Sequence, residues 1–260
     1  RPDHRRGQPQ RPAQRLAGRW DKAATQDLSI DLQADLMRYT VDAIAGLAFG
    51  AEVNTLESDG NVIQQHLDKI FPALFRRILA PVPIWRLLPS AADRQLARSM
   101  VEVNAAVEGF IGQARARMQA DPALRERPRN LLEAMIAAAD KPDSGIDDRQ
   151  VAGNVLTMLL AGEDTTANTL AWCIWLLHEH PQALARATAE ARTVMADGGP
   201  VTLEHLSRLD YIEACTHETM RLKPVAPQLP LQAVKDTVVG DVAVPAGQVL
   251  INLMRHDSVD

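Results

Sequence analysis

The sequence predicts a mainly α-helical protein with a small β-sheet region near its C-terminal end. From Leu32 to Leu222, apolar residues recur every three to four positions, which is the period of an amphipathic helix. Beyond Pro224 the period changes to two, and short runs rich in valine alternate with glycine and proline, as in strands and turns. Of the 260 residues, 46% are hydrophobic, which is sufficient for a sizeable core.

The predicted elements follow one another with short connections. Residues 1–28 are expected to be an irregular terminus, because Pro2, Pro9 and Pro12 interrupt a run rich in arginine. The first helix begins near residue 30 and ends at Gly50, since glycine commonly ends helices. Further helices are expected at residues 62–79, 91–120, 130–139, 181–196 and 210–222, and short strands within residues 237–252.

The longest predicted helix covers residues 147–180. Asp147 can cap its start together with Gln150, and Ile146 can pack onto Val151. Pro181 ends the helix because proline has no backbone N–H to donate. At 1.5 Å per residue such a helix is about 50 Å long. It is apolar nearly all round, so it is expected to lie in the interior.

A polar segment, residues 161–166 (Ala-Gly-Glu-Asp-Thr-Thr), interrupts this helix at its centre. Burying two acids and two hydroxyls costs free energy unless they serve a purpose. The Thr165 hydroxyl can donate to the carbonyl of Ala161, which bends a helix. Gly162 leaves a bare patch where a flat ligand or a diatomic molecule can approach, and Asp164 can relay protons there. The alternative is a structural kink whose acids face a water pocket.

A second group of residues lies on helix 210–222. Glu218 shares a helix face with Tyr211 and Leu222, and Arg221 follows three residues later, within reach of the carboxylate. A buried carboxylate needs a partner, and guanidinium can pair with it through two parallel hydrogen bonds. We therefore expect a buried Glu218–Arg221 ion pair that serves as a structural anchor. The alternative is a weak ion pair that faces solvent.

Both segments resemble motifs of the cytochrome P450 family of heme-thiolate monooxygenases. Residues 161–166 resemble its oxygen-activation motif, and Glu218-Thr219-Met220-Arg221 resembles its Glu-x-x-Arg helix. The order of the two motifs and the strand pattern ending at Pro245 are also similar to the family. The resemblance covers residues 29–260 and implies an incomplete P450 fold, so that residues 1–260 form a partial domain.

The resemblance implies a role for each residue. Thr165 would hydrogen-bond dioxygen at the heme, and Asp164 would help to deliver protons. Ala161 and Gly162, together with Thr165, would line the distal heme face. The Glu218–Arg221 pair would lock the fold on the proximal side. Residues 61–118 would be the mobile helices that cover the substrate channel.

The resemblance also implies a cofactor and partners. The full-length protein would bind heme b through its iron and insert one atom of O2 into an apolar organic substrate. Its electrons would come from a reductase, either separate or fused downstream, or from a ferredoxin. The family's axial cysteine belongs to a loop beyond residue 260, so no metal ligand is expected in this chain, and the chain alone is expected to be inactive. Cys173 and Cys215 are interpreted as small core residues.

Composition limits the other classes of function. The net charge of −5 gives no argument for nucleic-acid binding. Two cysteines indicate a reducing compartment, so a cytoplasmic location is expected. No signal peptide is visible, and Glu163 and Asp164 interrupt the most apolar stretch too early for a membrane span. An anchor in a preceding segment is compatible with the sequence.

The alternative function is that of a non-enzymatic helical scaffold or interaction protein, which would use the apolar residues 81–88 to bind a partner. It would leave the polar segment 161–166 and Glu218 without a purpose. A di-iron carboxylate protein needs Glu-x-x-His pairs, and the sequence contains none.

Overall fold

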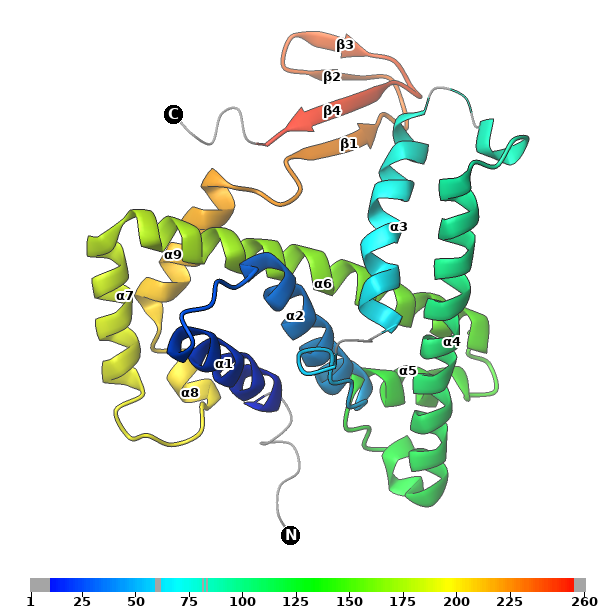
Figure 1. The fold of residues 1–260 in the computed structure, drawn as a ribbon. Helices are drawn as coiled ribbons and strands as arrows, with labels where there is room; N and C mark the ends of the chain where they lie inside the picture. Colours follow the sequence, from blue (N-terminus) through cyan, green and yellow to red (C-terminus); the bar gives the residue numbers. More distant parts are fainter. Residues whose placement is uncertain (1–9, 59–61, 81, 83, 255–260) are drawn as a thin grey trace. The chain divides into compact units, whose positions relative to one another are not determined.

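The structure is a computed structural model that describes residues 10–58, 62–80, 82 and 84–254 (Figure 1). It comprises two compact units, residues 1–167 and 168–260. The longest helix, α6 (Asp148–Glu179), contributes its first part to one unit and its last part to the other. The mainly helical fold with a small β region is confirmed.

The first unit is helical in its described residues. Besides the first part of α6, it contains α1 (Gln10–Thr25), α2 (Leu32–Phe49), α3 (Val62–Leu79), the 3-10 helix η1 (Ile84–Arg86), α4 (Ala91–Ala120), the 3-10 helix η2 (Pro122–Arg125) and α5 (Leu131–Ala139). Its core is made by α2, α4, α5 and α6, through residues that include Val41, Phe49, Val103, Val107, Leu132, Val155 and Leu159, all 0% exposed.

Helix α1 replaces most of the irregular terminus that we expected at residues 1–28. Residues 10–25 are helical, whereas residues 1–9 lie outside the described part of the chain. The helix is fixed by tertiary contacts: Arg19 Nε and Trp20 Nε1 donate to the carboxylate of Asp35 on α2 over 2.8 and 3.0 Å. Pro12 lies in the first turn, where a missing N–H costs little.

Helices α3 and α4 lie in the segment, residues 61–118, where we expect the substrate lid. The two helices pack on each other near the start of α4, where Arg77 pairs with Asp93 over 2.9 Å. Both helices also contribute to the core, α3 through Ile70 and Ala73 and α4 through buried residues from Leu96 to Met118; Phe110 of α4 stacks on Phe49. The assignment of residues 61–118 as a substrate lid stays a prediction.

Helix α6 begins at a capping box. Gln150 N donates to Asp147 Oδ1 over 2.7 Å, and Asp147 N donates to Gln150 Oε1 over 2.9 Å. The helix ends at Glu179, next to Pro181. These bounds differ from the expected ones by only one residue at each end. The agreement is close because both signals, the capping box and the proline, are local in the sequence.

Up to residue 254, where the described part of the chain ends, the second unit combines the last part of α6 with three further helices and two pairs of strands. The helices are α7 (Pro181–Val194), α8 (Leu203–Leu206) and α9 (Asp210–Leu222). The strands are β1 (Gln228–Gln232), β2 (Thr237–Val239), β3 (Val242–Val244) and β4 (Val249–Leu253).

The strands form two antiparallel ladders. Strands β2 and β3 form a hairpin in which Thr237 faces Val244, and Gly240 in its two-residue loop has a φ of +63°. Strands β1 and β4 pair from Gln228 opposite Leu253 to Gln232 opposite Val249. Strand β1 was not expected from the sequence, because its pairing partner lies on the far side of the hairpin.

The start of α9 is capped by a residue of another helix. The carboxylate of Glu190 on α7 accepts hydrogen bonds from the backbone N–H groups of Tyr211 and Ile212 over 2.8 and 2.9 Å. Arg186 lies 4.0 Å from the centre of the Tyr211 ring. The sequence predicts a helix at residues 210–222 but not this cap, because the cap joins residues 21 and 22 positions apart.

None of the helices in the described part of the chain combines the length and the hydropathy that crossing a membrane requires.

Candidate functional site

The residues of the polar segment divide between two sides of α6. One side is buried and consists of residues four positions apart that are at most 1% exposed: Val151, Val155, Leu159, Glu163 and Ala167. The other side is exposed within this chain and carries small side chains: Asn154, Thr157, Ala161 and Thr165. The candidate site is the exposed side, because a ligand can reach it.

Thr165 lies on the exposed side, although the helix was expected to lie in the interior, and it makes the hydrogen bond that the sequence suggested. Its Oγ1 donates to the carbonyl of Ala161 over 2.7 Å. Since the hydroxyl is turned back against the helix, Ala161 and Thr165 together present a low surface. Asp164, the next residue in the segment, is half-buried. A flat apolar ring fits against such a surface better than against a side lined with bulky residues.

Gly162 does not lie on this exposed side. A β-carbon at Gly162 would lie 2.3 Å from Cδ1 of Ile44 on α2. The missing side chain therefore allows α2 and α6 to pack closely, and the bare patch that we expected to receive a ligand is occupied by Ile44. The expectation that Gly162 lines the heme face stays a prediction, and any contact there would be made by its backbone.

Glu163 faces the interior. Its side chain is in the buried face, where the residue is 1% exposed, and its carbonyl accepts a hydrogen bond from Thr40 Oγ1 of α2 over 3.1 Å. The two acids of the segment thus have different surroundings, since only Asp164 adjoins the exposed side. Sequence reasoning did not find Thr40, because this contact joins residues 123 positions apart.

The second unit contains the predicted ion pair. Arg221 Nε donates to Glu218 Oε2 over 2.7 Å, and Arg221 Nη2 donates to Glu218 Oε1 over 2.6 Å. Hydrogen bonding to Arg221 lowers the pKa of Glu218, and the same bond raises the pKa of Arg221. The side chains are 54% and 44% exposed, so the predicted pairing is present but the predicted burial is wrong.

The burial was wrong because the helix face that carries Glu218 is not packed into a core. It lines a pocket of about 370 Å³ in the second unit, together with Tyr211, Cys215 and Leu222 of α9 and Leu176 near the end of α6. The predicted helix face on α9 is therefore present, but its residues line a pocket and are not packed into a core.

The two cysteines of the chain also belong to the second unit. Cys173 is buried, as expected of a core residue, whereas Cys215 is half-buried and lines the pocket. Burial raises the pKa of the Cys215 thiol, which therefore stays protonated near neutral pH. Within the described residues, no group of three or more His, Cys, Asp or Glu side chains is arranged to hold a metal ion.

A further cluster in the second unit was not expected. Trp172 and Trp175 meet edge to face, with their ring centres 5.5 Å apart, and Lys223 Nζ lies 4.8 Å from the centre of the Trp172 ring. Spacing of three residues on α6 places the two rings on neighbouring positions of one side. Cation–π contact of this kind fixes the lysine that follows the Glu-x-x-Arg motif.

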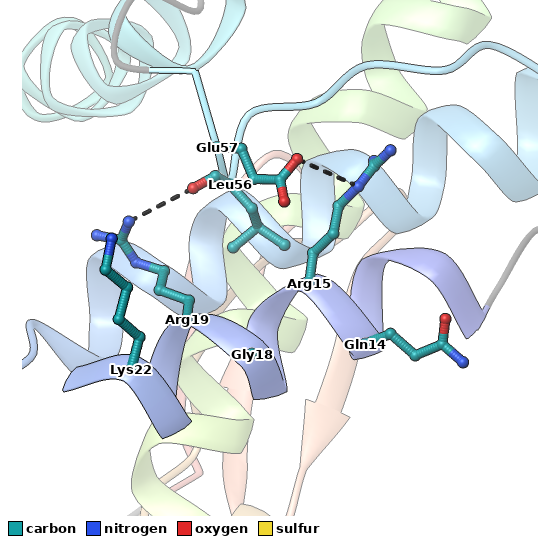
Figure 2. Close-up of a pocket in the computed structure, with 7 residues that line it drawn as sticks. All are labelled: Gln14, Arg15, Gly18, Arg19, Lys22, Leu56 and Glu57. Atoms are coloured by element: carbon teal, nitrogen blue, oxygen red, sulfur yellow. Dashed lines mark hydrogen bonds and ion pairs between the residues drawn. The ribbon is translucent and has the colours of Figure 1, made fainter. Parts of the chain in front are cut away.

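Another pocket, of about 630 Å³, lies in the first unit between α1 and the segment after α2 (Figure 2). Arg15 lies 3.7 Å from Glu57 and donates to Glu52 over 2.8 Å, while Arg19 donates to the carbonyl of Leu56. The lining carries the cations Arg15, Arg19 and Lys22 and the carboxylate Glu57. Arg15 and Arg19 are also paired with Glu52 and Asp35, which lie outside the lining.

The chain matches a known family along nearly its whole length. Residues 10–257 match the family model described as Cytochrome P450. The fold and the two motifs thus define a P450-type domain, and the chain belongs to the cytochrome P450 family.

Named relatives agree with this assignment. The chain is 29% identical to cyclooctat-9-en-7-ol 5-monooxygenase of Streptomyces melanosporofaciens over 90% of its own length and 48% of the relative's. It is 30% identical to the bifunctional cytochrome P450/NADPH–P450 reductase ascE of Acremonium egyptiacum, over 83% of this chain and 20% of that protein.

A solved structure agrees as well. The heme domain of cytochrome P450DA superposes with a TM-score of 0.80 at 26% identity, covering 96% of this chain and 52% of that one. The chain therefore spans about half of this heme domain, and less than half of the two relatives above.

Proposed function

We propose that this chain is part of a heme-dependent monooxygenase that inserts one atom of O2 into an apolar organic substrate. One observation carries the proposal: α6 presents Ala161 and Thr165 as a low exposed surface, with Asp164 beside it, in a chain that matches the P450 family.

The residues on the exposed side of α6 suit a heme. The side chains of Ala161 and Thr165 are short, so they allow a flat macrocycle to lie close to the helix. We assign the distal contact to these two residues and assign Gly162 to the packing of α6 on α2. When bound, heme supplies the redox chemistry that activates dioxygen. Its axial thiolate is proposed to come from a segment outside residues 1–260, because Cys173 and Cys215 have other surroundings.

Thr165 and Asp164 are proposed to handle protons. The Thr165 hydroxyl carries one proton, which it donates to the carbonyl of Ala161, and a hydroxyl oxygen can also accept hydrogen bonds. It can therefore pass its own proton to a ligand and accept another from the side of Asp164. Asp164 is half-buried and directly precedes Thr165 in the helix.

An apolar substrate is supported by the exposed side of α3. Leu74, Phe75 and Ile78 are 45–65% exposed, which is unusual for three large apolar residues on one turn of helix. A relative is named cyclooctat-9-en-7-ol 5-monooxygenase, and the alcohol in that name supports an organic substrate. We propose that helices within residues 61–118 cover the substrate and that Leu74 and Ile78 contact it.

The electron donor is proposed to be a reductase or a ferredoxin. A relative named as a fused P450 and NADPH–P450 reductase supports the first of these. The Glu218–Arg221 pair is proposed to anchor the fold once further segments cover α9. The cytoplasmic location expected from the sequence stays a prediction.

The test is to express the full-length parent gene, load it with heme and record the spectrum of the reduced protein with carbon monoxide. A heme-thiolate enzyme gives a strongly red-shifted Soret band. The purified protein should then oxidise apolar compounds in the presence of NADPH and a reductase, as measured by product mass. A full-length protein that binds no heme would instead support the scaffold alternative.

A further inference from the structure

We propose that Thr40 is a positioning residue that holds the α6 backbone from the side opposite the site and thereby fixes the Thr165 hydroxyl. This inference rests on the proposed function, because it concerns the helix segment that we assign to proton handling. It adds a residue on α2 to a site that otherwise belongs to α6 alone.

The first argument is the hydrogen bond itself. Thr40 is 2% exposed, and its Oγ1 lies 3.1 Å from the carbonyl oxygen of Glu163 and 2.9 Å from that of Met37. A hydroxyl has one proton, so these two carbonyls share it. The bond to Met37 is local within α2, but the bond to Glu163 joins two helices in a site that excludes water.

The second argument is that Thr40 acts together with a packing contact. Thr40 and Ile44 lie one turn apart on α2, and they contact neighbouring residues of α6. Ile44 fills the space beside Gly162, and Thr40 binds the carbonyl of Glu163. The packing contact sets how closely the helices approach, whereas the hydrogen bond sets the register of α6 against α2. Together they define the position of this segment.

The third argument links the contact to the site. Thr165 follows Glu163 by two residues, which is about 200° around a helix of 3.6 residues per turn. The two residues therefore lie on opposite sides of one turn, and a shift of the Glu163 carbonyl moves Thr165 with it. The Thr165 hydroxyl is bonded to the carbonyl of Ala161, an arrangement that tends to bend a helix. Thr40 holds the backbone against such bending.

The experiment uses the full-length heme-loaded enzyme with an accepted apolar substrate and its reductase. Three variants are compared with the wild type: Thr40→Val, which removes the hydroxyl and keeps the shape; Thr40→Ser, which keeps the hydroxyl; and Thr216→Val as the control. Thr216 is a half-buried threonine of α9 whose Oγ1 donates only to the carbonyl of Ile212, four residues before it. Product and hydrogen peroxide are measured per NADPH consumed.

We expect Thr40→Val to lower product per NADPH about 2- to 10-fold, the ratio that corresponds to one neutral hydrogen bond. Peroxide should rise correspondingly, and the substrate dissociation constant should stay unchanged. Thr40→Ser and Thr216→Val should keep the wild-type coupling. Wild-type coupling in Thr40→Val, or a loss of coupling in Thr40→Ser, would overturn the proposal.

A second readout does not depend on turnover. Hydrogen–deuterium exchange of peptides covering residues 161–167 should be faster in Thr40→Val and unchanged in Thr40→Ser. If Thr40→Val yields no folded protein, Thr40→Cys replaces it, because a thiol is a weak donor of nearly the same size as the serine hydroxyl. Equal exchange in all variants would contradict the role of Thr40. Absence of heme from the wild type would refute the proposed function but leave this exchange test valid.

Discussion

Ile44 on α2 occupies the space that a side chain at Gly162 of α6 would need. Its Cδ1 lies 2.3 Å from the position of a β-carbon at Gly162, and its Cγ1 lies 3.3 Å from it. Glycine at this position is thus required by the approach of two helices. Gly162 therefore contributes to the proposed site through the position of its backbone.

This contact predicts a compensating pair of substitutions. Gly162→Ala should destabilise the protein, because overpacking costs about 1–3 kcal/mol while alanine gains roughly 1 kcal/mol in helix propensity. Adding Ile44→Val removes Cδ1 and should recover most of the loss. The free energy of unfolding, measured with urea, checks both variants. Gly153→Ala is the control, since nothing lies within 4 Å of a β-carbon at Gly153. A double variant no more stable than Gly162→Ala would contradict the contact.

Thr165→Ala should leave the stability of the fold nearly unchanged but lower the amount of product formed per NADPH consumed. Thr165 is exposed and its hydroxyl bonds to its own helix, so the free energy of unfolding should change by less than roughly 0.5 kcal/mol. In the full-length enzyme, peroxide release should rise and product should fall, because the proposed proton carrier is missing. Peroxide and product assays measure this.

Thr193→Ala on α7 is the matched control for Thr165→Ala. Thr193 is also exposed, and its Oγ1 makes the same local bond, to the carbonyl of Ala189 over 2.8 Å. Its coupling should equal that of the wild type. Normal coupling in Thr165→Ala would refute the role given to the hydroxyl.

Asp93 provides a pH test of the contact between α3 and α4. Hydrogen bonds from Ser90 and Arg77 lower the pKa of Asp93 to about 2. Because the pKa is lower in the folded state, the carboxylate stabilises the fold at pH values above its ordinary pKa of 3.8, and this stabilisation is lost as the pH falls toward 2. The titration of the Asp93 carboxyl carbon by NMR measures the pKa.

Two substitutions separate the causes of the low Asp93 pKa. Ser90→Ala and Arg77→Met should each raise it, since each removes a donor to the carboxylate. Arg76→Met, at the neighbouring exposed arginine of α3, should leave it low. An Asp93 pKa that stays near 2 in Ser90→Ala would show that the hydroxyl is not the main donor.

Glu190 should contribute as much to the free energy of unfolding as a good helix cap does. It accepts from the backbone N–H groups of Tyr211 and Ile212, which otherwise lack partners at the start of a helix. Glu190→Ala is expected to cost about 1 kcal/mol, and Glu190→Gln should cost less because an amide oxygen can still accept. Denaturant unfolding measures both. Glu204→Ala, at an exposed position in α8, is the control and should be nearly neutral. Equal stability of Glu190→Ala and Glu204→Ala would refute the cap.

Elements with local signals could be predicted from the sequence. The expected helices at residues 62–79 and 91–120 have the bounds of α3 and α4, because proline, serine and small residues punctuate the chain there. The bond from Thr165 to Ala161 could be predicted because it joins residues one turn apart. This hydrogen bond was therefore accessible from spacing alone, whereas the chemistry assigned to the segment stays a prediction.

Features that depend on distant residues could not be predicted. The approach of Ile44 to Gly162 joins two helices whose proximity no local pattern encodes. Glu218 was expected to be buried, because apolar spacing on α9 does not distinguish the wall of a pocket from a packed core. Strand β1 contains Pro230, which argues against a strand, and is stabilised by pairing with β4.

The pairing of β1 with β4 has a consequence for the order of folding. Residues 233–248 separate the two strands, and the β2–β3 hairpin lies within that interval. A hairpin with a two-residue loop closes rapidly, and once formed it brings the flanking ends together, which lowers the entropy lost when the outer strands meet. The β1–β4 ladder should therefore form after the hairpin. A substitution at Gly240 would then delay the formation of this ladder, although Gly240 is not part of it.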